Sequence, residues 1–120
     1  MIKVMYIKMK DFTNELIRSV RDDSQQKFRN SLKENDILII DDFQDSEGKE
    51  RTQEEFYNII EYILMEGKQV VIGCKKPPEE MYIMNERLND LFELNEIYEI
   101  TKPDLSARIE MLQRKIAAEN

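Results

Sequence analysis

The sequence predicts an α/β fold: a three-layer arrangement with a parallel sheet of about four strands and helices on both faces. Two observations lead to this class. Residues 37–40 and 70–72 form continuous apolar runs, which are typical of strands buried on both faces. Segments with apolar residues at helical spacing separate the runs, and strand–helix–strand alternation indicates parallel strands joined by right-handed crossovers.

The first half of the chain is predicted to hold two strands and two helices. Residues 2–8 alternate apolar and polar side chains, which predicts a short strand near a sheet edge. Asp11 is placed to cap a helix over 12–22, a second helix covers about 24–34, and the buried strand follows at 37–41. The residues of the first helix that we expect to face the core are Phe12, Leu16, Ile17 and Val20.

The second half is predicted to continue the same alternation. Thr52 and Glu55 have the spacing of a capping box, which predicts a helix start near Thr52, and Gly67 is typical of a helix end. Pro77 and Pro78 cannot extend a strand ladder, so they end the next strand. After a polar loop at 43–50, the expected elements are helix 52–66, strand 69–74, helix 80–92, strand 97–100 and helix 104–118.

Composition narrows the classes of function. The 120 residues suit a single domain over 1–120. A net charge of −7 argues against wrapping duplex DNA by bulk charge, but it is compatible with a local basic patch. The single cysteine, Cys74, suits a reducing cytoplasm, and the lack of histidine excludes His-based metal sites and triads. No apolar stretch is long enough to span a membrane, so we expect a cytoplasmic protein without a membrane partner.

Two adjacent carboxylates, Asp41 and Asp42, come at the end of the buried strand. In open α/β sheets, ligands bind beyond the carboxyl ends of the strands. The pair is therefore placed to hold a hydrated Mg²⁺ and to orient a water for phosphoryl transfer, as a Walker B element does. An Asp-rich turn after a buried strand explains the same two residues, and their spacing alone leaves both interpretations open.

Several segments together resemble the AAA+ ATPase core of the bacterial replication initiator family DnaA. The resemblance covers nearly the whole chain from residue 4 and needs almost no gaps. Its most specific parts are Asp-Asp-Phe-Gln and Lys-Glu-Arg-Thr-Gln-Glu-Glu-Phe. It implies a P-loop NTPase-like core. The segments that carry it are 5–6 with Phe12 downstream, 38–44, 48–56, 67–72, 77–80, 87–88, 103–105 and 108–109.

Parts of that family's catalytic machinery are missing or changed in this sequence. No G-x-x-x-x-G-K-[ST] phosphate loop is found, and the family's lid and C-terminal DNA-binding domain are not matched. Lys75 stands where the family has an acidic sensor, and Leu91 stands where it has an arginine finger. The resemblance thus implies an incomplete core. We expect no cofactor for the isolated chain. In a complete core ATP and Mg²⁺ would bind, with Asp41 on the metal and Asp42 polarising water.

The resemblance also implies contacts with single-stranded DNA. Ile17 falls at an apolar position of the family's initiator-specific helix pair, which packs against the strand. Arg51, with Lys49 beside it, falls at a basic position that pairs with the phosphate backbone. The residues alone favour a core position for Ile17 and a solvated position in the first turn of a helix for Arg51. The resemblance gives the DNA contacts equal weight, so both alternatives stay open.

Three functions follow as hypotheses. The first is a non-hydrolysing interaction or regulatory module that docks on a full-length initiator or on other replication proteins. The second is a single-stranded DNA binder. The third is a fragment or split part of a genuine ATP-binding initiator ATPase, whose phosphate loop another polypeptide supplies. The family's strand order also leaves a place between strands 69–73 and 97–100. Either these two strands pair directly, or a partner fills the gap, and only the second choice predicts that the chain forms homo-oligomers.

Overall fold

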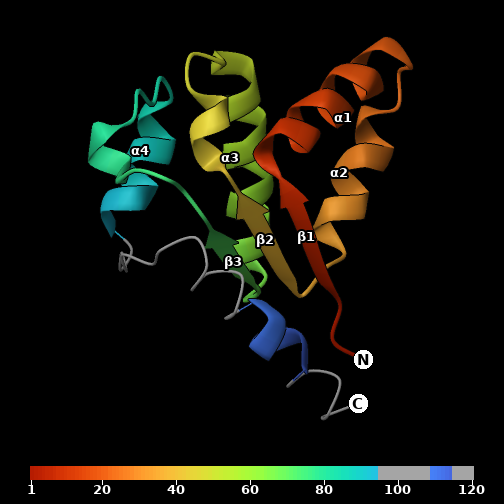
Figure 1. Ribbon diagram of the computed structural model, residues 1–120. Helices are drawn as coiled ribbons and strands as arrows, with labels where there is room; N and C mark the ends of the chain where they lie inside the picture. The colour runs from red at the N-terminus through yellow and green to blue at the C-terminus, as the bar shows by residue number, and fades with distance from the viewer. Residues whose placement is uncertain (95–108, 115–120) are drawn as a thin grey trace.

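The computed structural model describes residues 1–94 and 109–114 (Figure 1). It has the predicted α/β class, with helices packed on a parallel sheet. No helix in the described residues is long and apolar enough to cross a membrane. The elements are β1 (Val4–Lys8), α1 (Met9–Arg21), α2 (Gln25–Lys33), β2 (Ile37–Asp41), the 3-10 turn η1 (Phe43–Ser46), α3 (Glu50–Met65), β3 (Gln69–Ile72), the 3-10 turn η2 (Pro78–Glu80) and α4 (Glu86–Leu94).

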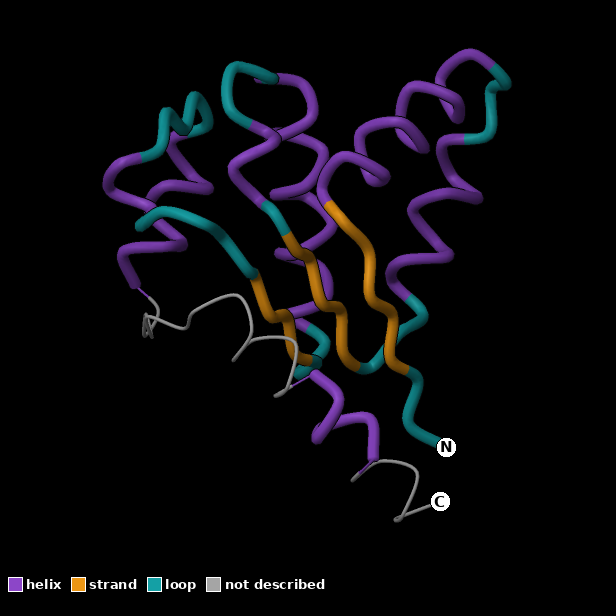
Figure 2. The backbone as a smooth tube through the Cα atoms, viewed as in Figure 1, coloured by secondary structure: helices purple, strands orange, loops and turns teal. Residues whose placement is uncertain are grey.

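The described sheet has three parallel strands in the order β1-β2-β3. Their arrows point the same way in Figure 1, so their carboxyl ends share one edge, and Figure 2 shows the three strands side by side. In the β1–β2 register, Tyr6 lies opposite Ile39 and Lys8 opposite Asp41. The strand predicted at 97–100 lies outside the described residues. So does most of the predicted last helix, of which 109–114 are helical.

The core lies on one face of this sheet. Leu38 and Ile40 of β2 are fully buried there against residues of α1, α2, α3 and α4. Because strand side chains alternate, Tyr6, Ile39 and Val71 lie on the other face. Three buried phenylalanines fasten the carboxyl edge to the core. The Phe12 and Phe56 ring centroids are 5.5 Å apart, and those of Phe43 and Phe56 are 5.1 Å apart.

Helix α1 differs from its prediction in start and orientation. It begins at Met9 with Lys8 at the N-cap, so Asp11 lies in the first turn and does not cap it. Ile17 and Val20 were expected in the core, but their side chains are 59% and 37% exposed. The buried stripe is Met9, Phe12, Thr13, Leu16 and Ser19.

The two hydroxyl residues in that stripe explain the error. Thr13 Oγ1 donates to Met9 O at 3.0 Å, and Ser19 Oγ donates to Leu16 O at 2.7 Å. A hydroxyl that is satisfied by its own helix is cheap to bury. The inward stripe therefore includes two polar residues, and this rotation turns Ile17 outward.

The predicted starts of two later helices are also wrong. Helix α3 begins at Glu50, and Glu55, expected to complete a capping box with Thr52, forms an ion pair with Arg29 of α2. The helix predicted from residue 80 begins at Glu86, where Asn85 Oδ1 accepts the Leu88 N–H at 2.9 Å. That bond is an N-cap interaction. Gly67 does end α3, with a positive φ of 75°.

Candidate functional site

The two strand-end carboxylates occupy a rigid corner of the sheet. Asp41 is the last residue of β2, and Asp42 has a left-handed φ of 53° that turns the chain into η1. Backbone pairing continues past both strand ends: Gly73 N donates to Ile40 O at 2.7 Å, and Phe43 N donates to Gly73 O at 2.9 Å. These two bonds hold the residues immediately before Asp41 and immediately after Asp42.

Tyr6 of β1 is part of this site. Its hydroxyl donates to Asp41 Oδ2 at 2.5 Å, and Asp41 Oδ1 accepts the Asp42 N–H at 2.8 Å. Burial, the bond to Asp41 and the negative charges of Asp41 and Asp42 raise the pKa of Tyr6 to about 12. The phenol is therefore protonated at neutral pH and acts as a donor. Sequence reasoning missed Tyr6, because its place beside Asp41 depends on the strand register.

Gln44 connects the second carboxylate to the segment after β3. Its Nε2 donates to Asp42 Oδ1 at 3.3 Å, and its Oε1 accepts the Lys75 N–H at 3.1 Å. The backbone of Lys75 is thereby held near the carboxylates. Its side chain is a solvent-exposed cation.

The donor set at this corner supplies part of the coordination sphere of a divalent cation, which water or phosphate oxygens would complete. The described ranges contain no group of three or more Asp, Glu, Cys or His side chains that could hold a metal ion. Mg²⁺ typically takes one or two carboxylates together with substrate phosphates and water. Asp41 and Asp42 match that smaller contribution.

The residues expected to contact DNA lie on two helices. Lys49 and Arg51 are exposed at the start of α3, just beyond η1. Ile17 lies on a different helix, α1, about two turns after its first residue, and its side chain is exposed. Both helices begin at the carboxyl edge of the sheet (Figure 1), so the structure brings Lys49 and Arg51 together and leaves Ile17 on a neighbouring element.

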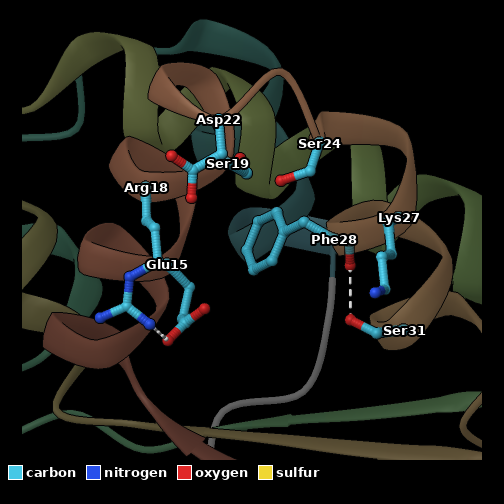
Figure 3. A pocket seen from close by; sticks show the side chains of 8 residues that line it. All are labelled: Glu15, Arg18, Ser19, Asp22, Ser24, Lys27, Phe28 and Ser31. Carbon is cyan, nitrogen blue, oxygen red and sulfur yellow. Dashed lines mark hydrogen bonds and ion pairs between the residues drawn. The ribbon is translucent and has the colours of Figure 1, made fainter.

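A shallow pocket of about 230 Å³ lies between α1 and α2 (Figure 3). Phe28 points into it from α2, and Glu15 on α1 forms an ion pair with Arg18 at 3.2 Å. Two acids and two cations line it, so it has no net charge to select an anion or a cation. The lining residues are Glu15, Arg18, Ser19, Asp22, Ser24, Lys27, Phe28 and Ser31.

Leu91 and Cys74 are both partly buried against neighbouring side chains. Leu91, which the sequence resemblance aligns with the family's arginine finger, is partly buried against the core, and the neighbouring Phe92 meets Phe43 with ring centroids 5.3 Å apart. Cys74 Sγ lies 3.2 Å from Met81 Sδ, and burial raises the pKa of the thiol. A half-buried thiol with a raised pKa is a poor nucleophile.

Comparison with known proteins identifies the relatives of this arrangement. Residues 1–98 match the family described as the bacterial DnaA ATPase domain. The chromosomal replication initiator proteins DnaA of Caldanaerobacter subterraneus subsp. tengcongensis and Thermoanaerobacter pseudethanolicus are each 42% identical over 118 residues. Those matches cover 98% of this chain but 27% of the relatives' own length.

Solved structures agree with the sequence matches. The AMPPCP-bound DnaA from Aquifex aeolicus is 32% identical with a TM-score of 0.78, over 82% of this chain and 31% of that one. Domain III of DnaA from Thermotoga maritima is 29% identical with a TM-score of 0.79, over 98% of this chain and 50% of that one. A replication initiator DnaA bound to AMPPCP and single-stranded DNA has the same 32% identity and a TM-score of 0.78, over 82% of this chain and 31% of that one. The chain therefore belongs to the bacterial DnaA family and corresponds to a part of its ATPase domain.

Proposed function

We propose that this chain works in replication initiation as a binding module that contacts single-stranded DNA and does not hydrolyse ATP by itself. The observation that carries the proposal is the exposure of Ile17, which α1 turns away from the core. Val20, one turn further along α1, is also partly exposed, so the helix presents an apolar surface. Single strands are held by apolar contacts to bases or sugars together with cations on phosphates. Lys49 and Arg51 at the start of α3 are the proposed cations.

A relative supports the DNA-binding part of the proposal. The structure of DnaA bound to AMPPCP and single-stranded DNA superposes on this chain with a TM-score of 0.78. The net charge of −7 opposes a general attraction to DNA, so binding must come from local cations. It should therefore be modest and strongly dependent on salt.

Replacing Arg51 by alanine tests this proposal. Arg51→Ala should weaken binding to a fluorescein-labelled single-stranded oligonucleotide and reduce the salt slope by about 1, because one phosphate contact is lost. Fluorescence anisotropy at several salt concentrations measures both effects. Lys3→Ala is the matched control, since Lys3 is exposed just before β1, at the opposite edge of the sheet. Equal losses in both variants, or no binding by the wild-type chain at low salt, would contradict the proposal.

The non-hydrolysing part of the proposal rests on two residues. Leu91 has no charge to place on a γ-phosphate and packs toward the core, whereas arginine fingers contribute 10³–10⁵ in rate in other phosphoryl-transfer enzymes. Lys75 places a cation where the family has an acid. The chain spans about a quarter of its curated relatives' length. We therefore do not propose that this chain alone has the ATPase activity of a whole initiator.

A second role is favoured by the intact corner at Asp41 and Asp42. We propose that, when another polypeptide supplies a phosphate loop, Asp41 contributes to binding Mg²⁺ and Asp42 orients a water. Mg²⁺ would there neutralise charge on the nucleotide phosphates. Tyr6 and Gln44 already hold both carboxylates in place. Under this proposal the chain provides one wall of a composite nucleotide site.

The proposed protein partners are a full-length initiator, other replication proteins or further copies of the chain, in the cytoplasm. In the described sheet, β1 and β3 are the outer strands, and outer strands offer unpaired backbone groups to a partner. We expect tagged chain to capture a full-length DnaA-family initiator, and light scattering at micromolar concentration to show self-association. A clean monomer that captures no initiator in any nucleotide state would contradict this.

A further inference from the structure

We propose that Tyr6 is a positioning residue that orients Asp41 toward a divalent cation. The inference rests on the proposed composite site, in which Asp41 contributes a metal ligand. Tyr6 comes from a different strand, and the family resemblance, which includes residues 5–6, gave it no role in a site. Its hydroxyl nevertheless makes a short, charge-assisted hydrogen bond to Asp41, with 2.5 Å between the two oxygens.

The two hydrogen bonds on Asp41 fix the plane of its carboxylate. Oδ2 accepts from the Tyr6 hydroxyl, and Oδ1 accepts from the Asp42 N–H at 2.8 Å. Donors on both oxygens oppose rotation about the Cβ–Cγ bond. An ionised carboxylate has about four acceptor sites, so each oxygen of Asp41 keeps capacity for a metal ion. Outer hydrogen bonds of this kind typically orient metal-binding carboxylates.

The sheet explains why Tyr6 can hold this position. Tyr6 pairs with Ile39 in the parallel register, and Asp41 lies two residues beyond Ile39 on the same face. The phenol therefore reaches diagonally across the two strands, within the range of aromatic side chains. β1 and β2 are hydrogen-bonded along their whole length, so the donor is carried by rigid backbone.

A purely structural role would leave metal binding unchanged, so the test measures the metal. The probe is Mn²⁺ alone, titrated into the full chain while paramagnetic broadening of the amide signals of residues 41–44 is followed by NMR. Tyr6→Phe keeps the ring and removes the donor. We expect it to raise the apparent Kd for Mn²⁺ about tenfold or more, the usual size of such outer-shell losses.

Two further variants make the result decisive. Tyr62→Phe removes a hydroxyl from a tyrosine near the end of α3, whose ring lies 4.5 Å from Lys33 Nζ, and should leave the Kd unchanged. Asp41→Asn should abolish the local broadening. Equal Kd values for wild type and Tyr6→Phe would overturn the role of Tyr6 and leave the composite site standing. Equal broadening in wild type and Asp41→Asn would overturn both.

Discussion

Asp42 combines an unusual backbone conformation with a carboxylate of the candidate site. Its φ of 53° lies in the left-handed region, which glycine, asparagine and aspartate accept far more readily than other residues. That conformation turns the chain out of β2 so that Phe43, with 0% exposure, enters the core. Aspartate therefore suits the backbone here even before its carboxylate is considered.

The backbone demand can be separated from the charge. Asp42→Val should lower the free energy of unfolding by about 1–2 kcal/mol, because a β-branched residue is strained in the left-handed region. Asp42→Asn should stay within about 0.5 kcal/mol of wild type, since asparagine tolerates that conformation. Urea unfolding of the three proteins measures the difference. Equal stabilities for the valine and asparagine variants would show that the turn carries no strain.

At the scale of elements, a buried glutamine joins α3 to the segment before α4. Gln53 is fully buried, and its Oε1 accepts the Met84 N–H at 2.8 Å. Its Nε2 donates to Ser46 O at 3.1 Å and to Tyr82 O at 3.4 Å. One side chain thus satisfies three backbone groups from two segments and helps set the path of the chain toward Asn85 and α4.

Removing that amide should loosen the segment. Gln53→Met keeps the length of the side chain but leaves buried backbone groups unpaired, so it should cost about 1–3 kcal/mol of unfolding free energy. Hydrogen exchange at the Met84 amide should also become faster. Gln26 is an exposed residue of α2, and its side chain bonds to Asn30 one turn away. Gln26→Met should therefore cost at most about 0.5 kcal/mol. Similar costs for both variants would contradict the role assigned to Gln53.

The elements also show how far local sequence patterns reach. Strand β2 was predicted with its observed bounds, and α2 to within one residue at each end, because their apolar patterns are local. The starts of α3 and α4 were missed. Glu55 binds Arg29, 26 positions away, and Gln53 binds Met84, 31 positions away, and no short-range rule contains such pairs. Asn85, by contrast, is a short-range N-cap signal for the observed start of α4.

The candidate site divides in the same way. Asp41 and Asp42 were predictable, because a buried strand must expose its end and its next residues at the sheet edge. Tyr6 was not, because its bond to Asp41 spans 35 positions and depends on the β1–β2 register. The helical spacing favoured a core position for Ile17, because spacing alone does not show that the Thr13 and Ser19 hydroxyls are satisfied within α1 and can be buried.

At the scale of the whole molecule, the chain has the side chains proposed to bind Mg²⁺ and DNA but carries other residues at two positions where the family resemblance implies catalytic ones. The carboxyl edge holds an oriented carboxylate pair, and the helices that start there carry Ile17 and Arg51 on their exposed surfaces. The sequence resemblance aligns Leu91 with the family's arginine finger and Lys75 with its acidic sensor, and neither residue keeps the family's side chain. This distribution favours a protein that binds single-stranded DNA and that takes part in ATP hydrolysis only when another chain completes the nucleotide site.

Phosphate release from Mg²⁺-ATP is the most direct test of that claim. The purified chain should release phosphate no faster than its Asp42→Asn variant, because the groups that stabilise charge on the transferred phosphoryl are not supplied. A polypeptide carrying a DnaA-type phosphate loop, added to the wild-type chain, is the positive control for the composite site. Phosphate release by the wild-type chain alone that Asp42→Asn abolishes would contradict the account.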